Sequence, residues 1–147
     1  MPPKSTPKRR ASKKEGALSL FVELSSVLIG QPADPATARR HFATLQGASK
    51  DHPLGPVFQR FRAVKAAGGD IVQGVKDRLV NDAALGPLVK TVMSLWFTGQ
   101  QAGQGAPVFA SQDDYFQALM WSCVGAHPPA LSDGYFGHWR YPPDTGR

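Results

Sequence analysis

Apolar residues recur at helical spacing along most of the chain, and the strict alternation that is typical of half-buried strands is absent. The clearest pattern runs from Leu85 to Trp96, where Pro87 stands in the expected first turn and Gly99 follows as a stop. Together these patterns predict an all-α fold of five or six short helices. The positions expected to face its core are Leu20, Phe21, Leu24, Val27, Leu28, Ala38, Phe42, Leu45, Val57, Phe58, Phe61, Val64, Leu85, Leu88, Val89, Val92, Met93 and Trp96.

Capping residues and glycines indicate where the first three helices begin and end. Gly30 is the expected stop of the first helix. Asp34-Pro35 combines an N-cap with a proline at the first helical position, and Gly47 is expected to end the helix that follows. Gly68-Gly69 closes a third.

The second half of the chain carries weaker signals. Residues 71–80 have a partial helical pattern that Gly74 is expected to interrupt. Residues 99–110 are predicted to be a long loop, because they are too rich in Gly and Gln to form an element. Ser111-Gln-Asp-Asp114 matches a capping box with Asp in place of the usual Glu. It predicts one last helix, which passes through Tyr115, Leu119, Met120 and Cys123.

The C-terminal tail has a composition that regular structure does not accommodate. From His127 to Pro143 it holds four prolines, two glycines and four aromatic residues. Proline removes a backbone donor and drives its preceding residue towards extended conformations, so an irregular course is expected. The aromatic side chains carry more apolar area than a solvated tail would, which indicates that the tail packs against a further surface.

The first sixteen residues hold most of the formal charge. They contain six Lys/Arg and one Glu, a net charge of +5 out of +6, and no aromatic or branched aliphatic residue. Such a segment cannot bury enough surface to offset chain entropy, so it is expected to be a disordered basic leader. The remainder is close to neutral, which weakens a nucleic-acid interpretation. We therefore expect three parts: a leader at 1–16, a helical domain at 17–125 and an irregular partner-docking tail at 126–147.

Residues that could carry chemistry are few and scattered. The single cysteine, Cys123, excludes an internal disulfide and is expected to be a small core residue. Asp113 and Asp114 are adjacent, and helix capping explains them better than acid–base catalysis. No apolar run reaches the ~18 residues of a membrane span. The histidines, which lack metal-ligand spacing, are His41, His52, His127 and His138.

Four segments, in order, resemble the small subunit of the membrane-associated FAD-dependent sugar and polyol dehydrogenases, the sorbitol, fructose and glucose dehydrogenase complexes of proteobacteria. Phe21-Val-Glu-Leu-Ser-Ser-Val-Leu-Ile-Gly30 resembles the opening Phe-x-x-Leu-Ser-x-x-Leu-x-Gly of that family. Ser94-Leu-Trp-Phe-Thr-Gly99 is similar to its Ala-Trp-Tyr-x-Gly helix end, and Tyr115-Phe-Gln-Ala-Leu-Met-Trp121 to its Tyr-x-x-Ala-Leu-x-Trp helix. The ending resembles Pro-Pro…Gly-x-x-Gly-x-Trp-x-x-Pro-Pro.

The resemblance implies a non-catalytic accessory subunit rather than an enzyme. In that family the small subunit holds no cofactor; it binds the large FAD-bearing subunit, which passes electrons to a multihaem cytochrome c subunit. The tail then becomes the expected interface with the FAD subunit, because aromatic side chains supply anchor area. The interface residues this implies are His127, Pro128, Pro129, Gly134, Tyr135, Phe136, Gly137, Trp139, Pro142 and Pro143.

Two departures from the family pattern bear on export and cross-linking. The family's small subunit carries a twin-arginine signal, and Arg9-Arg10 is present here, but no apolar stretch follows it soon enough. The resemblance implies the periplasmic face of the inner membrane. Without the signal, export by other means, a different start site or a cytoplasmic location are the alternatives. Many relatives have a tail cysteine where this chain has Ser132, so a disulfide through that position cannot form here.

A second hypothesis stays open beside the first. The chain would be a freestanding helical adaptor whose basic N-terminal arm binds nucleic acid or an anionic membrane surface. Against it, the arm has no interleaved aromatic residue for stacking on bases. The sequence does not name the sugar or polyol, because substrate contacts would lie in the partner.

Overall fold

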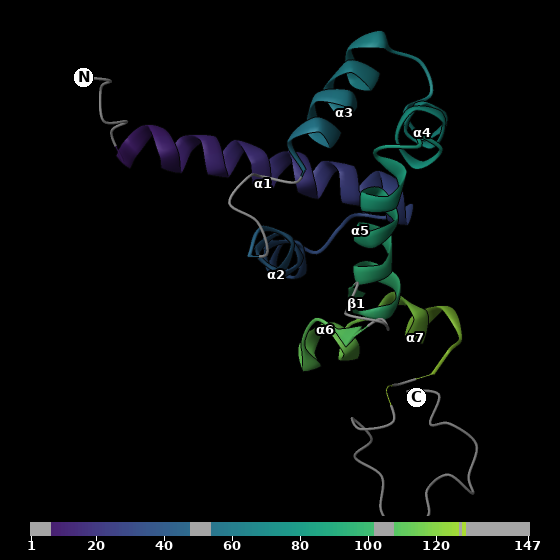
Figure 1. The fold of residues 1–147 in the computed structure, drawn as a ribbon. Helices are drawn as coiled ribbons and strands as arrows, with labels where there is room; N and C mark the ends of the chain where they lie inside the picture. The colour runs from purple at the N-terminus through teal and green to yellow at the C-terminus, as the bar shows by residue number, and fades with distance from the viewer. Residues whose placement is uncertain (1–6, 48–53, 102–107, 127, 129–147) are drawn as a thin grey trace, which may run out of the picture. The chain divides into compact units, whose positions relative to one another are not determined.

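The computed structural model describes residues 7–47, 54–101, 108–126 and 128, with the backbone alone for residues 7–15. Helices dominate this part of the chain, so the predicted all-α fold is confirmed (Figure 1). The chain is divided into two compact units, Met1–Met93 and Ser94–Arg147. The boundary falls inside a helix, whereas the sequence predicted a single helical domain over residues 17–125. The helices are α1 (Pro7–Ile29), α2 (Pro35–Gln46), α3 (Gly55–Ala67), α4 (Ile71–Val75), the π-helix η1 (Lys76–Val80), α5 (Gly86–Thr98), α6 (Gln112–Phe116) and α7 (Leu119–Cys123).

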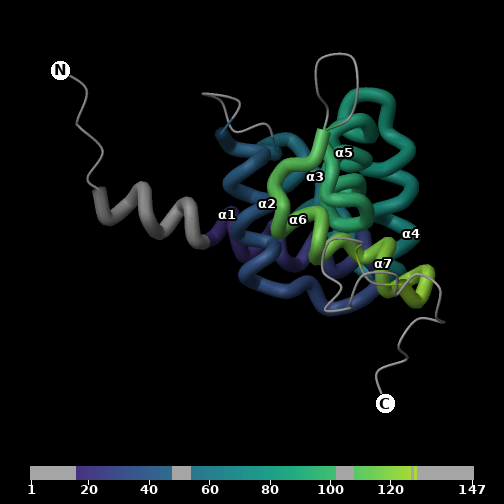
Figure 2. Tube along the Cα trace, turned by 90° about the horizontal axis from the view of Figure 1, so that it is seen from below, coloured from purple at the N-terminus to yellow at the C-terminus, as the bar shows by residue number. Residues whose placement is uncertain are grey.

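The first unit is built around α1, which contacts α2, α3 and α4 (Figure 2). An aromatic series joins three of these helices. The ring centroids of Phe21 and Phe42 lie 5.4 Å apart, and those of Phe42 and Phe58 lie 6.4 Å apart. Since each ring buries a large apolar area, these contacts account for much of the packing between the helices.

Most of the positions predicted to face the core are buried. These are Phe21, Leu24, Ala38, Phe42, Leu45, Val57, Phe58, Phe61, Val64, Val89, Val92 and Trp96. The prediction was wrong for six others, which are only half-buried: Leu20, Val27, Leu28, Leu85, Leu88 and Met93. The buried apolar residues that were not predicted include Leu54, Val75, Leu79 and Leu95.

The expected helix ends around α2 are present. Gly30 follows α1 with φ +72°, a left-handed conformation that favours glycine, and its N–H donates to the carbonyl of Ser26 at 3.1 Å. Asp34 caps α2: its carboxylate accepts a hydrogen bond from the backbone N–H of Thr37 at 2.7 Å. Pro35 occupies the first turn, where its missing N–H costs nothing.

The start of α1 differs from the expectation of a disordered leader through Gly16. The helix begins at Pro7, so residues 7–16 are helical, while residues 1–6 lie outside the described residues. Ala, Lys, Arg and Glu are good helix formers, and extending a helix that is already packed costs far less than nucleating one. Gly16 does not end or begin the helix.

Gly74 does not interrupt its segment, contrary to the prediction. It lies inside α4, which continues directly into η1. A Cβ atom at this position would lie 2.7 Å from Cγ1 of Val64 in α3. Glycine is required because α3 and α4 approach closely there, not because the helix breaks.

The predicted loop at residues 99–110 contains two short strands at its ends. β1 (Gln100–Gln101) pairs antiparallel with β2 (Val108–Phe109), with Gln100 opposite Phe109. This corrects the expectation that residues 99–110 form no element of their own. Among the described residues, no helix combines the length and the apolar character that crossing a bilayer requires.

Candidate protein-docking surface

The second unit is organised around Gly99, which ends α5. Its N–H donates to the carbonyl of Leu95 at 3.0 Å, and its φ of +69° favours glycine. A Cβ atom there would lie 2.6 Å from the carbonyl oxygen of Asp114, a backbone atom that cannot move aside. The carbonyl of Gly99 also accepts from the N–H of Ala110 at 2.9 Å. One glycine therefore brings the end of α5, the β-hairpin and α6 together.

Ser111 caps α6, as the capping box predicted. Its hydroxyl oxygen accepts from the backbone N–H of Asp114 at 3.0 Å and donates to the Asp114 carboxylate at 2.6 Å. The carboxylate thus pairs with the hydroxyl of the cap, and Asp114 is buried, whereas Asp113 is exposed. Capping accounts for the position of Asp114 at the start of the helix.

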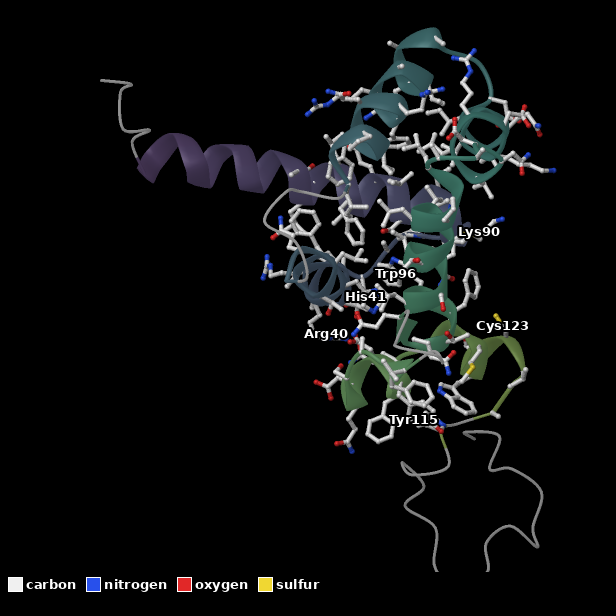
Figure 3. All side chains as sticks on the ribbon, viewed as in Figure 1. Arg40, His41, Lys90, Trp96, Tyr115 and Cys123 are labelled. Atoms are coloured by element: carbon white, nitrogen blue, oxygen red, sulfur yellow. The ribbon has the colours of Figure 1, made fainter. Side chains whose placement is uncertain are left out.

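The predicted last helix is in fact two short helices, α6 and α7. Ala118 separates them with an extended backbone, φ −59° and ψ 132°. This break changes the direction of the residues that follow, so Cys123 is exposed and points away from α7 (Figure 3). The prediction that Cys123 is a core residue was wrong for that reason.

Three residues of this unit, Phe109, Tyr115 and Trp121, form what we call the aromatic platform. Tyr115 stands at its centre (Figure 3), with the Phe109 ring 4.7 Å away at 68° and the Trp121 ring 5.3 Å away at 84°. Both are edge-to-face arrangements, which the ring quadrupoles favour. The indole N–H of Trp121 donates to the carbonyl of Tyr115 at 2.8 Å, which fixes α7 against α6.

Apolar area is exposed at the platform and beside it. Val108 and Phe109 are each 48 % exposed, and Val124, just after α7, is 70 % exposed. Tyr115 contacts the Phe109 ring on one side, and 48 % of the Phe109 surface stays exposed. Sequence analysis missed Val108 and Phe109 because they lie in the predicted loop; a β-branched and an aromatic residue directly after a Gly-rich stretch were the available signal.

The tail residues implied as partner contacts fall almost entirely outside the described part of the chain. Only Pro128 is described, and it is buried. The chain reaches it from α7 through a turn in which Gly125 has φ +65° and the N–H of Ala126 donates to the carbonyl of Trp121 at 2.9 Å. The tail therefore begins beside a platform residue.

Other candidate chemistry finds little support in the described residues. Of the histidines, His41 is described and is buried in α2, while His52, His127 and His138 lie outside the described residues. Within residues 7–47, 54–101, 108–126 and 128, no group of three or more His, Cys, Asp or Glu side chains is placed to hold a metal ion.

Among the described residues, two carboxylates have shifted pKa values, and both shifts come from hydrogen bonds with residues that follow closely in the sequence. The pKa of Asp34 is lowered, chiefly by its hydrogen bond with the side chain of Thr37 and then by that with the Thr37 backbone. The pKa of Asp82 is lowered by hydrogen bonds from the backbone N–H groups of Leu85 and Ala84. Asp34 caps α2, Asp82 accepts in the turn that precedes α5, and in both cases the hydrogen bonds favour the charged form.

In comparisons with known proteins, no family model, no curated protein and no solved structure matches this chain.

Proposed function

We propose that this chain is the non-catalytic small subunit of an FAD-dependent sugar or polyol dehydrogenase complex. It would bind and assemble the large FAD-bearing subunit, hold no cofactor itself, and act as part of a heteromer. The observation that carries the proposal is the occurrence of four segments in family order, from Phe21-…-Gly30 to the Pro-Pro ending.

The structure gives physical reasons for residues in three of these motifs. Gly30 and Gly99, the final glycines of the first two segments, both follow helices with positive φ. In the third segment, Tyr115 and Trp121 contact each other across the break at Ala118, which requires the spacing Tyr-x-x-Ala-x-x-Trp. Tyr115 and Trp121 of the third segment are thus also residues of the aromatic platform.

The partner surface would comprise the tail together with the platform. Exposed aromatic area with fixed rings is the kind of surface that supplies interface anchors, because rigid rings lose little entropy on binding. A multihaem cytochrome c subunit is a further partner in this proposal. In this proposal the chain acts at the periplasmic face of the inner membrane, with the cytoplasm as the alternative.

Co-purification from the native host tests this function. The full chain, with a C-terminal affinity tag, is expected to retain a large flavoprotein, detected by flavin absorbance and by mass spectrometry. The yield of flavin per chain should fall in Phe109→Ala. It should stay unchanged in Val72→Ser, which alters an exposed apolar residue of α4. Recovery of the chain without any flavoprotein would contradict the proposal.

The second candidate is a helical adaptor whose basic arm binds nucleic acid or an anionic membrane. The observation in its favour is the early start of α1: five of the six leader Lys/Arg residues lie within the helix, from Lys8 to Lys14. Deleting residues 17–147 separates the candidates. Polyanion binding that survives in the remaining arm favours the adaptor, and flavoprotein capture by a chain without residues 1–16 favours the dehydrogenase subunit.

A further inference from the structure

We propose that helices α1 to α3 bind the phosphate backbone of a double-stranded nucleic acid without sequence specificity, and that Arg39 of α2 and Arg62 of α3 contribute contacts. The proposal goes beyond the dehydrogenase function and does not depend on it. It also differs from the adaptor hypothesis, which assigns binding to the N-terminal arm alone, because it places part of the binding on the folded helices.

The charge of the chain is divided unevenly along its length. Residues 1–67 hold 12 Lys/Arg and 4 Asp/Glu, a net charge of +8, whereas residues 68–147 hold 5 Lys/Arg and 7 Asp/Glu, a net charge of −2. The near-neutral part after the leader therefore has a positive first segment, because residues 17–67 hold 6 Lys/Arg and 3 Asp/Glu. Concentrated positive charge attracts polyanions, since binding to phosphates releases their condensed counterions.

The outer faces of α2 and α3 carry arginine and alanine. Neither helix contains an acidic residue. In α2, Arg39 is exposed on the side opposite the buried stripe, together with Ala36 and Ala43. In α3, Arg62 is exposed, with the exposed Ala66 one turn later. A guanidinium group offers paired N–H donors that match the oxygens of a phosphate, so these arginines are suited to backbone contacts.

The described carboxylates of α1 and of the α2 cap have other partners. Glu23 of α1 forms an ion pair with Lys65 of α3. The carboxylate of Asp34 accepts from the backbone N–H of Thr37 at 2.7 Å. These two carboxylates are thus engaged within the unit and leave the exposed arginines of the outer faces available to an anionic partner.

The three helices belong to one packed body. The ion pair joins α1 to α3, and the Phe42 and Phe58 rings, 6.4 Å apart, join α2 to α3. Their charges therefore act together on a polyanion, and no single pocket is needed, because counterion release adds up over separate phosphate contacts.

The surroundings of the arginines favour a duplex over a membrane or a single strand. A helix that binds in a bilayer interface buries large apolar side chains there. Among the described residues, the large apolar side chains that are exposed lie outside α1, α2 and α3: they are Val72, Val108, Phe109 and Val124. Single strands are bound through exposed aromatic rings, on which the bases stack. Contacts to the phosphates of a duplex require neither feature.

Fluorescence anisotropy of a short labelled duplex, titrated with the full chain at several salt concentrations, tests the proposal. The logarithm of the binding constant should fall linearly with the logarithm of the salt concentration, by about 0.9 per phosphate contact. Arg39→Gln and Arg62→Gln should each reduce the magnitude of this slope by about 0.9, and the double variant by about 1.8. Gln is a good helix former, so the melting temperature of these variants should stay unchanged.

Two further double variants separate contacts from net charge. Arg39→Lys with Arg62→Lys keeps both charges and should retain the slope of the wild type. Lys76→Gln with Arg78→Gln is the matched control. It removes the same charge from exposed positions of η1, where Asp77 lies between the two cations, and should leave the slope unchanged.

Three results would overturn the inference. A slope that Arg39→Gln and Arg62→Gln leave unchanged would assign binding to the arm alone. An equal loss of slope in the η1 control would show a response to net charge without contacts at α2 and α3. Absence of duplex binding, with or without binding to vesicles of anionic lipid or to polyglutamate, would exclude nucleic acid as the partner. None of these measurements involves a flavoprotein, so the dehydrogenase proposal stands or fails separately.

Discussion

The indole N–H of Trp121 donates to the carbonyl oxygen of Tyr115 at 2.8 Å, and the two rings meet nearly at a right angle. This pair holds α7 against α6 across the extended Ala118. Trp121→Phe keeps a ring in place but removes the donor, so it should cost about 1 kcal/mol of stability. Trp121→Ala removes both and should cost more. Urea unfolding followed by far-ultraviolet circular dichroism measures both losses; unchanged stability in Trp121→Phe would mean that the hydrogen bond contributes nothing.

Gly74 and Gly16 give a matched pair of Gly→Ala substitutions within helices. Gly16→Ala meets no heavy atom within 4 Å and should stabilise the chain by about 0.5–1 kcal/mol through helix propensity. Gly74→Ala should destabilise it, because Cγ1 of Val64 lies 2.7 Å from the new Cβ and a β-branched side chain has few alternative rotamers. Melting temperatures of the two variants should shift in opposite directions. A rise for both would show that α3 and α4 separate at little cost.

Asp34 links stability to pH at the start of α2. Because its folded-state pKa is lowered from 3.8, its contribution is present above pH 3.8 and is lost as the pH falls through the lower folded-state value. Asp34→Ala should cost about 1 kcal/mol at neutral pH. Asp34→Asn keeps an acceptor oxygen but does not titrate, so the stability gap between it and the wild type should narrow below pH 4. A gap that stays constant from pH 7 to pH 3 would refute the linkage.

Trp139 and Trp96 are expected to act on different properties. Trp96 is buried, so Trp96→Ala should lower the stability of the chain by about 3–5 kcal/mol. Trp139→Ala should leave the melting temperature of the free chain almost unchanged and weaken capture of the flavoprotein by about 2–4 kcal/mol, roughly 30- to 1000-fold. If Trp139→Ala unfolds the free chain as severely as Trp96→Ala, the tail belongs to the core of this chain and the partner role of Trp139 is wrong.

Cys123 should behave as a surface thiol. Its exposure in the structure predicts that a thiol reagent such as dithionitrobenzoate modifies the folded chain at nearly the rate it modifies the urea-unfolded chain. Cys123→Ser should fold with unchanged stability and give no reaction. A reaction that required unfolding would restore the core position that the sequence suggested.

The sequence predicted the buried faces of α2 and α3 because a 3.6-residue apolar period, bounded by Asp34-Pro35 and Gly68, leaves one stable arrangement. It failed at Ala118 because alanine is a strong helix former, and no local signal indicates its extended backbone. The pairing of Gln100 with Phe109 was missed for another reason: two-residue strands have no period to detect. The aromatic platform is therefore seen only in the structure, in which the Phe109 ring lies against Tyr115.

Among the described residues, contacts that build the second unit join residues close in sequence, such as Gly99 with Ala110 and Asp114, and Tyr115 with Trp121. Bringing such residues together loses little chain entropy, and low contact order goes with fast folding. The hairpin with α6 and α7 is thus suited to assemble early, as soon as the end of α5 has formed. A substitution at Gly99 should then slow folding as well as destabilise the folded state. It would obstruct the docking of the hairpin and α6 at the end of α5, which precedes the remaining contacts of the unit.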